Sequence, residues 1–461
     1  MFTKTLFHRD FTVYFLVFLS FILYIFRFAA GAEFNGSIIG STWSWGSLTE
    51  NLLIQNPVLA IWNMHSQPPL VNSIYAIAYL FYPNQLIFLQ ALWFIFTTLI
   101  PILLFKSLRL MNLPYKFAFA LSCLYCFYPN TLGYAFSGYN TIVVQFSFAF
   151  FVYSLVKLVV SRVRTIIPFC ISSAVLFLVR APFLGVALIL MLLIVYSINF
   201  KRYKFVPGCF IAAALSIALI MVFQFHYIKD FNQLTSSSLG GFSTLRLLKV
   251  GLDNHDYSKL QTNDCETMLL KEADSGDSIK EFPSCQNKAL LLRINLDEIS
   301  EYGNSINSLG SLQVAILARD LALKVLKEHP FSLVNAVFGR DNQLGSLDYF
   351  LSVKTLGDRP LRQFIDNFPF FASLLALLYI LFRKIASVLF KVNFKSETNL
   401  ERSISIILVG LLFAFTVFYS LATEILENDR YKHEAYPIYF FLLGTIVSQV
   451  FSSRRELNVD Q

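Results

Sequence analysis

Long runs of apolar residues recur along this chain and constrain its fold more than any other feature. A bilayer core about 30 Å thick needs roughly 20 helical residues at about 1.5 Å of rise each. Runs near that length lie at 11–30, 86–105, 117–135, 142–160, 206–226, 368–386, 403–422 and 436–452. The stretch 165–200 is interrupted near its middle by Arg180 and Pro182, which predicts two short spans joined by a tight turn. The sequence therefore predicts an all-α polytopic membrane protein with about ten transmembrane helices.

Composition excludes the other broad classes of protein. Apolar residues make up 56% of the chain and charged residues 14%, whereas a soluble domain carries about 25% charged residues. Disordered chains are poor in apolar residues and rich in charge, so disorder is excluded as well. The net charge of +8 does not indicate nucleic-acid binding, because Lys and Arg lie in short clusters between the apolar runs.

Those basic clusters predict the orientation of the chain. In a ten-span protein they all fall on one side, beginning at Lys4, Lys106, Lys157, Lys201, Arg383 and Arg454. Residues 31–68, which follow the first span, contain no Lys or Arg. Because basic residues stay on the cytoplasmic side, both termini are predicted to be cytoplasmic. Short loops and the lack of long tails favour a bacterial inner membrane.

The same pattern divides the chain into three parts. Residues 1–226 are predicted to form an N-terminal transmembrane module with a first outer loop at 31–85. Residues 227–366 form a larger extracytoplasmic segment of ordinary polarity. Residues 367–461 return to the membrane and include a charged outer loop at 424–437.

Helices lying on the membrane are expected in both outer parts. Residues 70–83 are apolar but too short to cross, and they follow Pro68 and Pro69, which predicts an interfacial helix. The amphipathic stretch 320–340 is interrupted at Pro330, which predicts two membrane-surface helices.

Cys265 and Cys285 also lie in the larger outer segment. A disulfide between them would close a loop of about 20 residues and stabilise by roughly 3 kcal/mol.

Charges at the outer surface are the strongest signal of a site. In the late loop 424–437, seven of fourteen residues are charged or histidine. Arg430 and Lys432 oppose the cytoplasmic bias and suit a phosphate, since guanidinium forms forked bonds to phosphate and Lys adds a point charge. Glu427 is placed to orient these cations. A solvated charged turn is the alternative. Arg180 would either hold an anion or reach the lipid headgroups.

Two further outer segments carry neutral or weakly basic groups. The paired prolines after Gln67 hold the chain extended and present His65, Ser66 and Gln67 at the membrane surface. His65 could equally be an interfacial histidine that completes a hydrogen bond. Tyr139 and Asn140, in the loop after the third span, could contact a sugar or form a plain polar turn.

The segment His65-Ser66-Gln67-Pro68-Pro69-Leu70, and the late segment from Glu427 through Arg430 to Tyr431 before Pro437, resemble motifs of the GT-C superfamily. More narrowly they resemble glycosyltransferase family 39, which includes protein mannosyltransferases and the aminoarabinose transferase acting on lipid A. The matching motifs lie within 47–85 and 424–445, and the topology is similar over most of the chain.

This resemblance implies a glycosyltransferase that moves a sugar from a polyprenyl-phosphate donor to a hydroxyl of a lipid, glycan or protein on the outer face. It implies that a first-loop carboxylate is the base and that Arg430 holds the lipid phosphate. The family usually carries an Asp early in this loop, and none is present here. Glu50 is preferred as the base, with Glu33 as the alternative, and His65 would orient a substrate. Gln67, Tyr431, Lys432 and Arg180 complete the expected donor site.

No cofactor is expected, and the few first-loop carboxylates argue against an essential divalent metal. A lipid or polysaccharide transporter or flippase is the main alternative function, followed by a non-catalytic envelope-assembly protein. Coupled transporters place ionisable residues at mid-membrane. Here the span interiors are nearly free of them, and the unusual charges gather at the outer surface.

Overall fold

The computed structural model describes about half of the chain, and every regular element in that part is an α-helix. The longer described stretches are 2–34, 50–64, 68–136, 140–160, 167–179, 221–229, 239–252, 309–338 and 433–457. The shorter ones are residues 48, 218, 266, 347, 364, 367–375, 377–379, 382, 406, 408–414, 416–417 and 421. The expected all-α class is confirmed for these residues.

Three of the described helices are long and apolar enough to cross a membrane. They lie within α1 (Phe2–Ala29), α5 (Gln85–Leu110) and α8 (Thr141–Val160). Their candidate spans, Phe11–Ala29, Gln85–Leu110 and Thr141–Val160, lie within or close to runs predicted from the sequence. Shorter apolar helices occupy three further predicted runs, at 115–126, 167–179 and 436–445. The structure is therefore compatible with an α-helical membrane protein, while the number ten stays a prediction.

The expected span 117–135 is wrong as a single helix. It consists of α6 (Tyr115–Cys126) and α7 (Pro129–Ala135), which are separated at Phe127 and Tyr128. Tyr128 has an extended backbone, with φ −68° and ψ 122°. The reason is local, because a proline disfavours the helical conformation in the residue that precedes it. Pro129 is tolerated as the first residue of the new helix.

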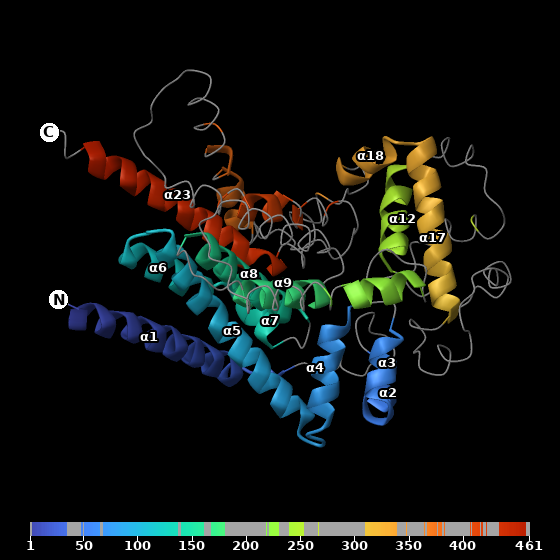
Figure 1. The fold of residues 1–461 in the computed structure, drawn as a ribbon, viewed down its shortest axis with the longest axis horizontal. Helices are drawn as coiled ribbons and strands as arrows, with labels where there is room; N and C mark the ends of the chain where they lie inside the picture. The colour runs from blue at the N-terminus through green and yellow to red at the C-terminus, as the bar shows by residue number, and fades with distance from the viewer. Residues whose placement is uncertain are drawn as a thin grey trace.

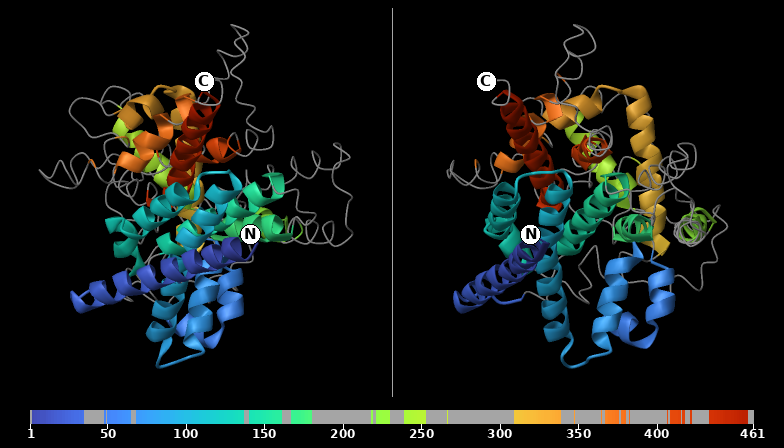
Figure 2. Two further views of the ribbon diagram at one scale, coloured as in Figure 1. Left: turned by 90° about the vertical axis from the view of Figure 1, so that its left-hand side faces the viewer. Right: turned by 60° about the vertical axis from the view of Figure 1, so that its left-hand side comes forward.

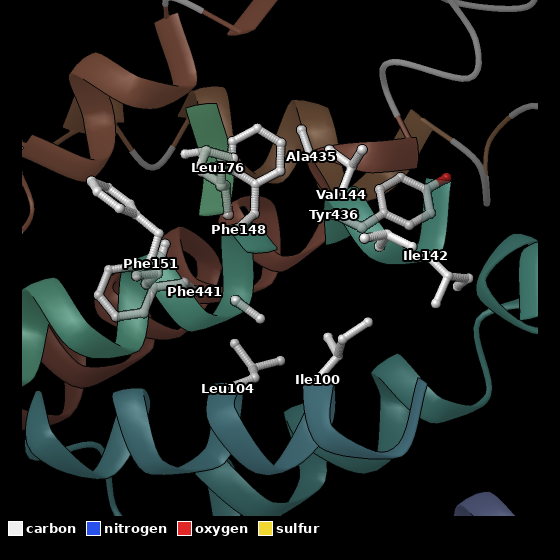
Figure 3. Close-up of a cluster of buried hydrophobic side chains, with 14 of the residues drawn as sticks. Ile100, Leu104, Ile142, Val144, Phe148, Phe151, Leu176, Ala435, Tyr436 and Phe441 are labelled. Carbon is white, nitrogen blue, oxygen red and sulfur yellow. The ribbon is translucent and has the colours of Figure 1, made fainter. Parts of the chain in front are cut away.

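Helix α8 lies at the centre of the bundle and packs against α5, α9 (Ile167–Val179) and the last helix, α23 (Tyr436–Leu457). Figure 3 shows Ile100 and Leu104 of α5 pointing toward side chains of α8 and α23. Between apolar helices in lipid, close contact replaces the hydrophobic effect as the main attraction. Gly444 provides such a contact, since a Cβ there would overlap the side chain of Leu108.

The bundle has two distinguishable ends. The first residues of α1 and the last residues of α23 lie at the same end, on the left of Figure 1, which we call the terminal end. The basic residues Lys106, Arg109, Lys116 and Lys157 lie in the turns of α5, α6 and α8 at that end. We call the opposite end, with the last turn of α1 and the first turn of α8, the loop end.

The segment predicted to be the first outer loop forms three short helices at the loop end, drawn in blue in Figures 1 and 2. These are α2 (Glu50–Gln55), α3 (Pro57–Trp62) and α4 (Pro69–Tyr79). Prolines begin α3 and α4, where their missing N–H is not needed. The expected short helix after Pro68 is thereby confirmed. Asn72 is wholly buried, and its Oδ1 accepts a hydrogen bond of 2.8 Å from the backbone N–H of Leu48.

A second helical group belongs to the larger outer segment and consists of α12 (Leu239–Gly251), α17 (Leu309–Glu328) and α18 (Ser332–Phe338). The expected pair of helices around Pro330 is confirmed as α17 and α18. Helix α12 packs against both. Gly251 permits the contact with α18, because a Cβ there would overlap the backbone carbonyl of Ser332.

Candidate functional site

Three of the residues singled out as site candidates lie in the described part of the chain, namely Glu33, Glu50 and Asn140. The others lie outside it: His65, Gln67, Tyr139, Arg180, Cys265, Cys285, Glu427, Arg430, Tyr431 and Lys432. Their roles, and the disulfide, stay predictions. The site is therefore built from the described residues that flank them.

The chain that leads into the His65 motif is held by the helical residues 221–229. Nε2 of His226 lies 2.7 Å from the backbone oxygen of Trp62, and the Tyr227 hydroxyl donates a hydrogen bond of 2.8 Å to the backbone oxygen of Met64. Since a carbonyl oxygen only accepts, Nε2 of His226 carries the proton in this contact. We call these four residues the motif clamp.

Packing makes the motif clamp rigid. The His226 imidazole stacks on the Trp62 indole with ring centroids 4.0 Å apart. His226, Tyr227 and Met64 are all buried, and so is Pro68 on the far side of the motif. Burial raises the pKa of the Tyr227 hydroxyl, so this group stays a donor through the neutral range. Both flanks of the motif are thus fixed in the protein.

Glu50 is exposed at the first residue of α2 and lies beside α4. Burial raises the pKa of Tyr79, and the Glu50 carboxylate raises it further. A carboxylate disfavours a nearby phenolate because both are negative. Tyr79 is the last residue of α4, so Glu50 lies near the end of α4 opposite to Pro69.

Glu33 is also exposed, and it follows the last turn of α1 at the loop end. The neighbouring Phe34 meets Trp93 of α5 edge to face at 6.3 Å, and Trp93 stacks on Tyr75 of α4. Earlier in α1, Tyr24 stacks at 4.3 Å on Phe136, which directly follows α7. Phe34, directly after Glu33, therefore contacts α5, and α1 contacts the end of α7 earlier in the helix.

The end of the late charged loop is buried at this same end of the bundle. His433 and Glu434 are 2% and 3% exposed. The His433 ring lies 5.5 Å from the ring of Tyr134 in α7 and 4.9 Å from that of Tyr436. The backbone oxygen of His433 accepts a hydrogen bond of 2.8 Å from the Gln145 amide of α8. The segment carrying Arg430 and Lys432 thus joins the bundle on α7 and α8.

Helix α9 brings the chain before Arg180 to the loop end as well. The ring of Phe151 in α8 lies 5.3 Å from that of Phe169 in α9. Because the two helices run in opposite directions with the same rise per residue, this contact sets Val179 level with Thr141. Helix α9 also packs against α4. Asn140 stands directly before α8, and its backbone oxygen accepts a hydrogen bond of 2.9 Å from Val144 N–H.

Sequence reasoning missed several residues that hold this region together. Gln145 is an amide in a largely apolar run, and a polar side chain inside a span is itself a signal. His226 and Tyr227 stand at the end of another apolar run and carried a similar signal. Arg27 lies in the last turn of α1, at the loop end, where it opposes the charge bias. Its guanidinium lies beside Gly133 of α7.

In the part of the chain that the structure describes, no group of three or more His, Cys, Asp or Glu side chains is arranged to hold a metal ion. Comparison of the chain with family models, with curated proteins and with solved structures finds no match.

Proposed function

We propose that this chain is an integral membrane glycosyltransferase of the GT-C type. It moves a sugar from a polyprenyl-phosphate donor to a hydroxyl of a lipid, glycan or protein acceptor on the outer face of the membrane. Both termini are cytoplasmic in this proposal, and the membrane is a bacterial inner membrane. The position of Lys106, Arg109, Lys116 and Lys157 at the terminal end supports that orientation, because basic residues favour the cytoplasmic side.

One observation carries the proposal. The flanks of two motifs, more than 300 residues apart in the chain, are anchored at the loop end of one bundle. The first motif follows the motif clamp, and α4, which begins within it, packs against α9. The late charged loop ends on α8, the neighbour of α9. A transferase needs its acceptor-activating group and its phosphate-binding group within one site.

The proposed reaction is a displacement at the anomeric carbon of the donor sugar. A first-loop carboxylate takes the proton of the acceptor hydroxyl while that oxygen bonds to the anomeric carbon. The bond from the anomeric carbon to the phosphate oxygen breaks, and polyprenyl phosphate leaves with the electron pair. General-base catalysis of this kind contributes about 10²–10⁴-fold.

Cations at the late loop would stabilise the leaving phosphate. Arg430 has the first role, with Lys432 and Arg180 beside it, because charge develops on the phosphate oxygens as the bond breaks. Glu427 orients the cations, Gln67 and Tyr431 contact the donor, and His65 orients a substrate. Tyr139 and Asn140 are proposed sugar contacts.

The contacts of the described residues change the preference between the two carboxylates. The last turn of α1, six residues before Glu33, lies against α7 through Arg27 and Gly133, and α7 also touches the end of the late loop through Tyr134 and His433. Glu50 instead lies by Tyr79, near the far end of α4. We therefore propose Glu33 as the base, in place of the preferred Glu50.

The test is release of polyprenyl phosphate by the purified protein. Polyprenyl-phosphate mannose and polyprenyl-phosphate aminoarabinose are the donors, with total outer-membrane lipid as the acceptor and an Arg430→Ala variant as the control. Release by the parent protein alone supports the proposal. In the absence of release, movement of the intact donor across sealed vesicles would establish a flippase instead. If the protein shows neither activity, the transferase proposal fails and the envelope-assembly role remains.

A further inference from the structure

Gln145 is a polar side chain in the second turn of α8, at the centre of the bundle, and it is wholly buried. The adjacent side chains of α8 are apolar. A buried amide that lacks hydrogen-bond partners destabilises the folded protein. Its presence in this helix therefore depends on the partners that the fold supplies.

Those partners come from two other segments of the chain. The Tyr125 hydroxyl of α6 donates a hydrogen bond of 2.9 Å to Oε1 of Gln145. Nε2 of Gln145 donates one of 2.8 Å to the backbone oxygen of His433. The first bond fixes the orientation of the amide, and the second ties the start of the last helix to a residue 288 positions earlier.

The turn held in this way is enclosed by the protein. Ala435 and Tyr436 are 0% exposed, and His433 and Glu434 are nearly so. The rings of Tyr134 and Tyr436 both contact the His433 ring. Because its backbone and its side chains are both held, the turn has one position relative to α8.

Helix α23 is also held independently of Gln145. It packs against α5, α6 and α8, and the ring of Tyr439, one turn after its first residue, meets the rings of Phe370 and Phe413. Loss of the Gln145 bond is therefore expected to release the turn at His433 while α23 stays in place. This separates the position of the turn from the stability of the bundle.

We propose that Gln145 is a positioning residue for the late charged loop. By holding the His433 carbonyl, it sets the point from which Lys432 and Arg430, one and three residues earlier, leave the bundle. Stabilisation of a leaving phosphate depends strongly on position, and a displacement of about 1 Å can cost about 10²-fold. This role rests on the proposed function.

The experiment replaces Gln145 with Met, which is similar in length and cannot form either hydrogen bond. The control is Ser147→Ala in the same helix, because the Ser147 hydroxyl is buried but bonds to Val143 O of its own helix, at 2.7 Å. Tyr125→Phe removes the group that orients the amide and should act in the same direction with a smaller effect.

Two measurements are made on each variant. In an Ala435→Cys background, the rate of labelling by a membrane-impermeant maleimide is followed by mass spectrometry of the peptide that carries the introduced thiol. Gln145→Met should raise that rate about tenfold, because the turn is no longer held. The kcat for release of polyprenyl phosphate should fall about tenfold or more, with a smaller change in KM and unchanged amounts of protein in the membrane.

Unchanged labelling in Gln145→Met would overturn the positioning role by itself. Faster labelling with an unchanged kcat would reduce Gln145 to a packing residue and would overturn the positioning role too. Equal effects in Ser147→Ala would contradict a specific role for Gln145, because loss of any polar group in α8 would then act in this way. If the parent protein releases no polyprenyl phosphate, the transferase proposal fails instead, and the labelling still decides whether Gln145 holds the turn.

Discussion

Nε2 of His226 lies 2.7 Å from the backbone oxygen of Trp62, and their rings stack with centroids 4.0 Å apart. The next residue, Tyr227, reaches the backbone oxygen of Met64 with its hydroxyl. Two consecutive side chains thus hold two nearby carbonyl groups of the first outer loop. The chain directly before the His65 motif is consequently held by a segment 163 residues away.

The motif clamp predicts a graded loss of stability. Tyr227→Phe leaves the buried Met64 carbonyl without its donor, which costs about 1–3 kcal/mol. His226→Ala should cost more, because the stacking on Trp62 is lost together with the hydrogen bond. Thermal unfolding in detergent measures both. Phe225→Leu is the matched control, because Phe225 is exposed on the same helix. A Tyr227→Phe protein as stable as the parent would contradict the role of that bond.

Gly251 and Gly133 predict opposite outcomes for the same change. Gly251→Ala places a methyl group on the backbone carbonyl of Ser332, so α12 and α18 must separate, at about 1–3 kcal/mol. At Gly133 a Cβ would meet the Arg27 guanidinium at 3.9 Å, an ordinary contact. Gly133→Ala should therefore be neutral or stabilise by up to about 1 kcal/mol. Limited proteolysis of the outer segment checks the first change, and thermal unfolding checks both. Equal behaviour of the two variants would refute the close contact.

Arg430→Ala should lower the release of polyprenyl phosphate by about 10²–10³-fold, the usual effect of removing a donor to developing charge. Lys432→Ala should lower it less, because Lys interacts as a point charge without the forked geometry of Arg. Both proteins should reach the membrane in normal amounts, as shown by immunoblotting of membrane fractions. Near-normal release by Arg430→Ala would remove the proposed phosphate site.

The two first-loop carboxylates predict different kinetics. Glu33→Gln should lower kcat by about 10²–10⁴-fold, since the general base is lost while the shape of the side chain is kept. Glu50→Gln should stay within about tenfold of the parent, because Glu50 takes no part in the proton transfer. Measurement of kcat against pH gives a second readout, because a general base produces an acidic limb that its Gln variant lacks. The reverse ranking would identify Glu50 as the general base and would contradict the choice of Glu33 from the contacts of α7.

The periodicity and length of the apolar runs predicted most of the described helices. The runs at 11–30, 86–105 and 142–160 correspond to α1, α5 and α8. Their ends agree within a few residues, except that α1 begins earlier and α5 ends later than predicted. The break between α6 and α7 was not predicted, although Pro129 stands at it. An apolar run shows that a segment suits a membrane, but proline effects on backbone dihedrals decide where a helix ends.

The candidate site was predictable only in part. His65, Arg430 and the two glutamates stood out because charged or histidine side chains are unusual beside apolar spans. Gln145 and Tyr125 did not, because a single amide or phenol in an apolar run has no recognisable partner until the helices are assembled. The same holds for His226, whose acceptor is a backbone oxygen 164 residues away.

The sequence by itself determined that this protein is helical and suited to a membrane, because those properties follow from local hydrophobicity and helix length. Only the tertiary structure decided which segments meet at the loop end, including Gln145 with His433 and Tyr227 with Met64. The physical reason is that hydrogen bonds between distant segments depend on how helices pack side by side. Local sequence carries little information about that packing.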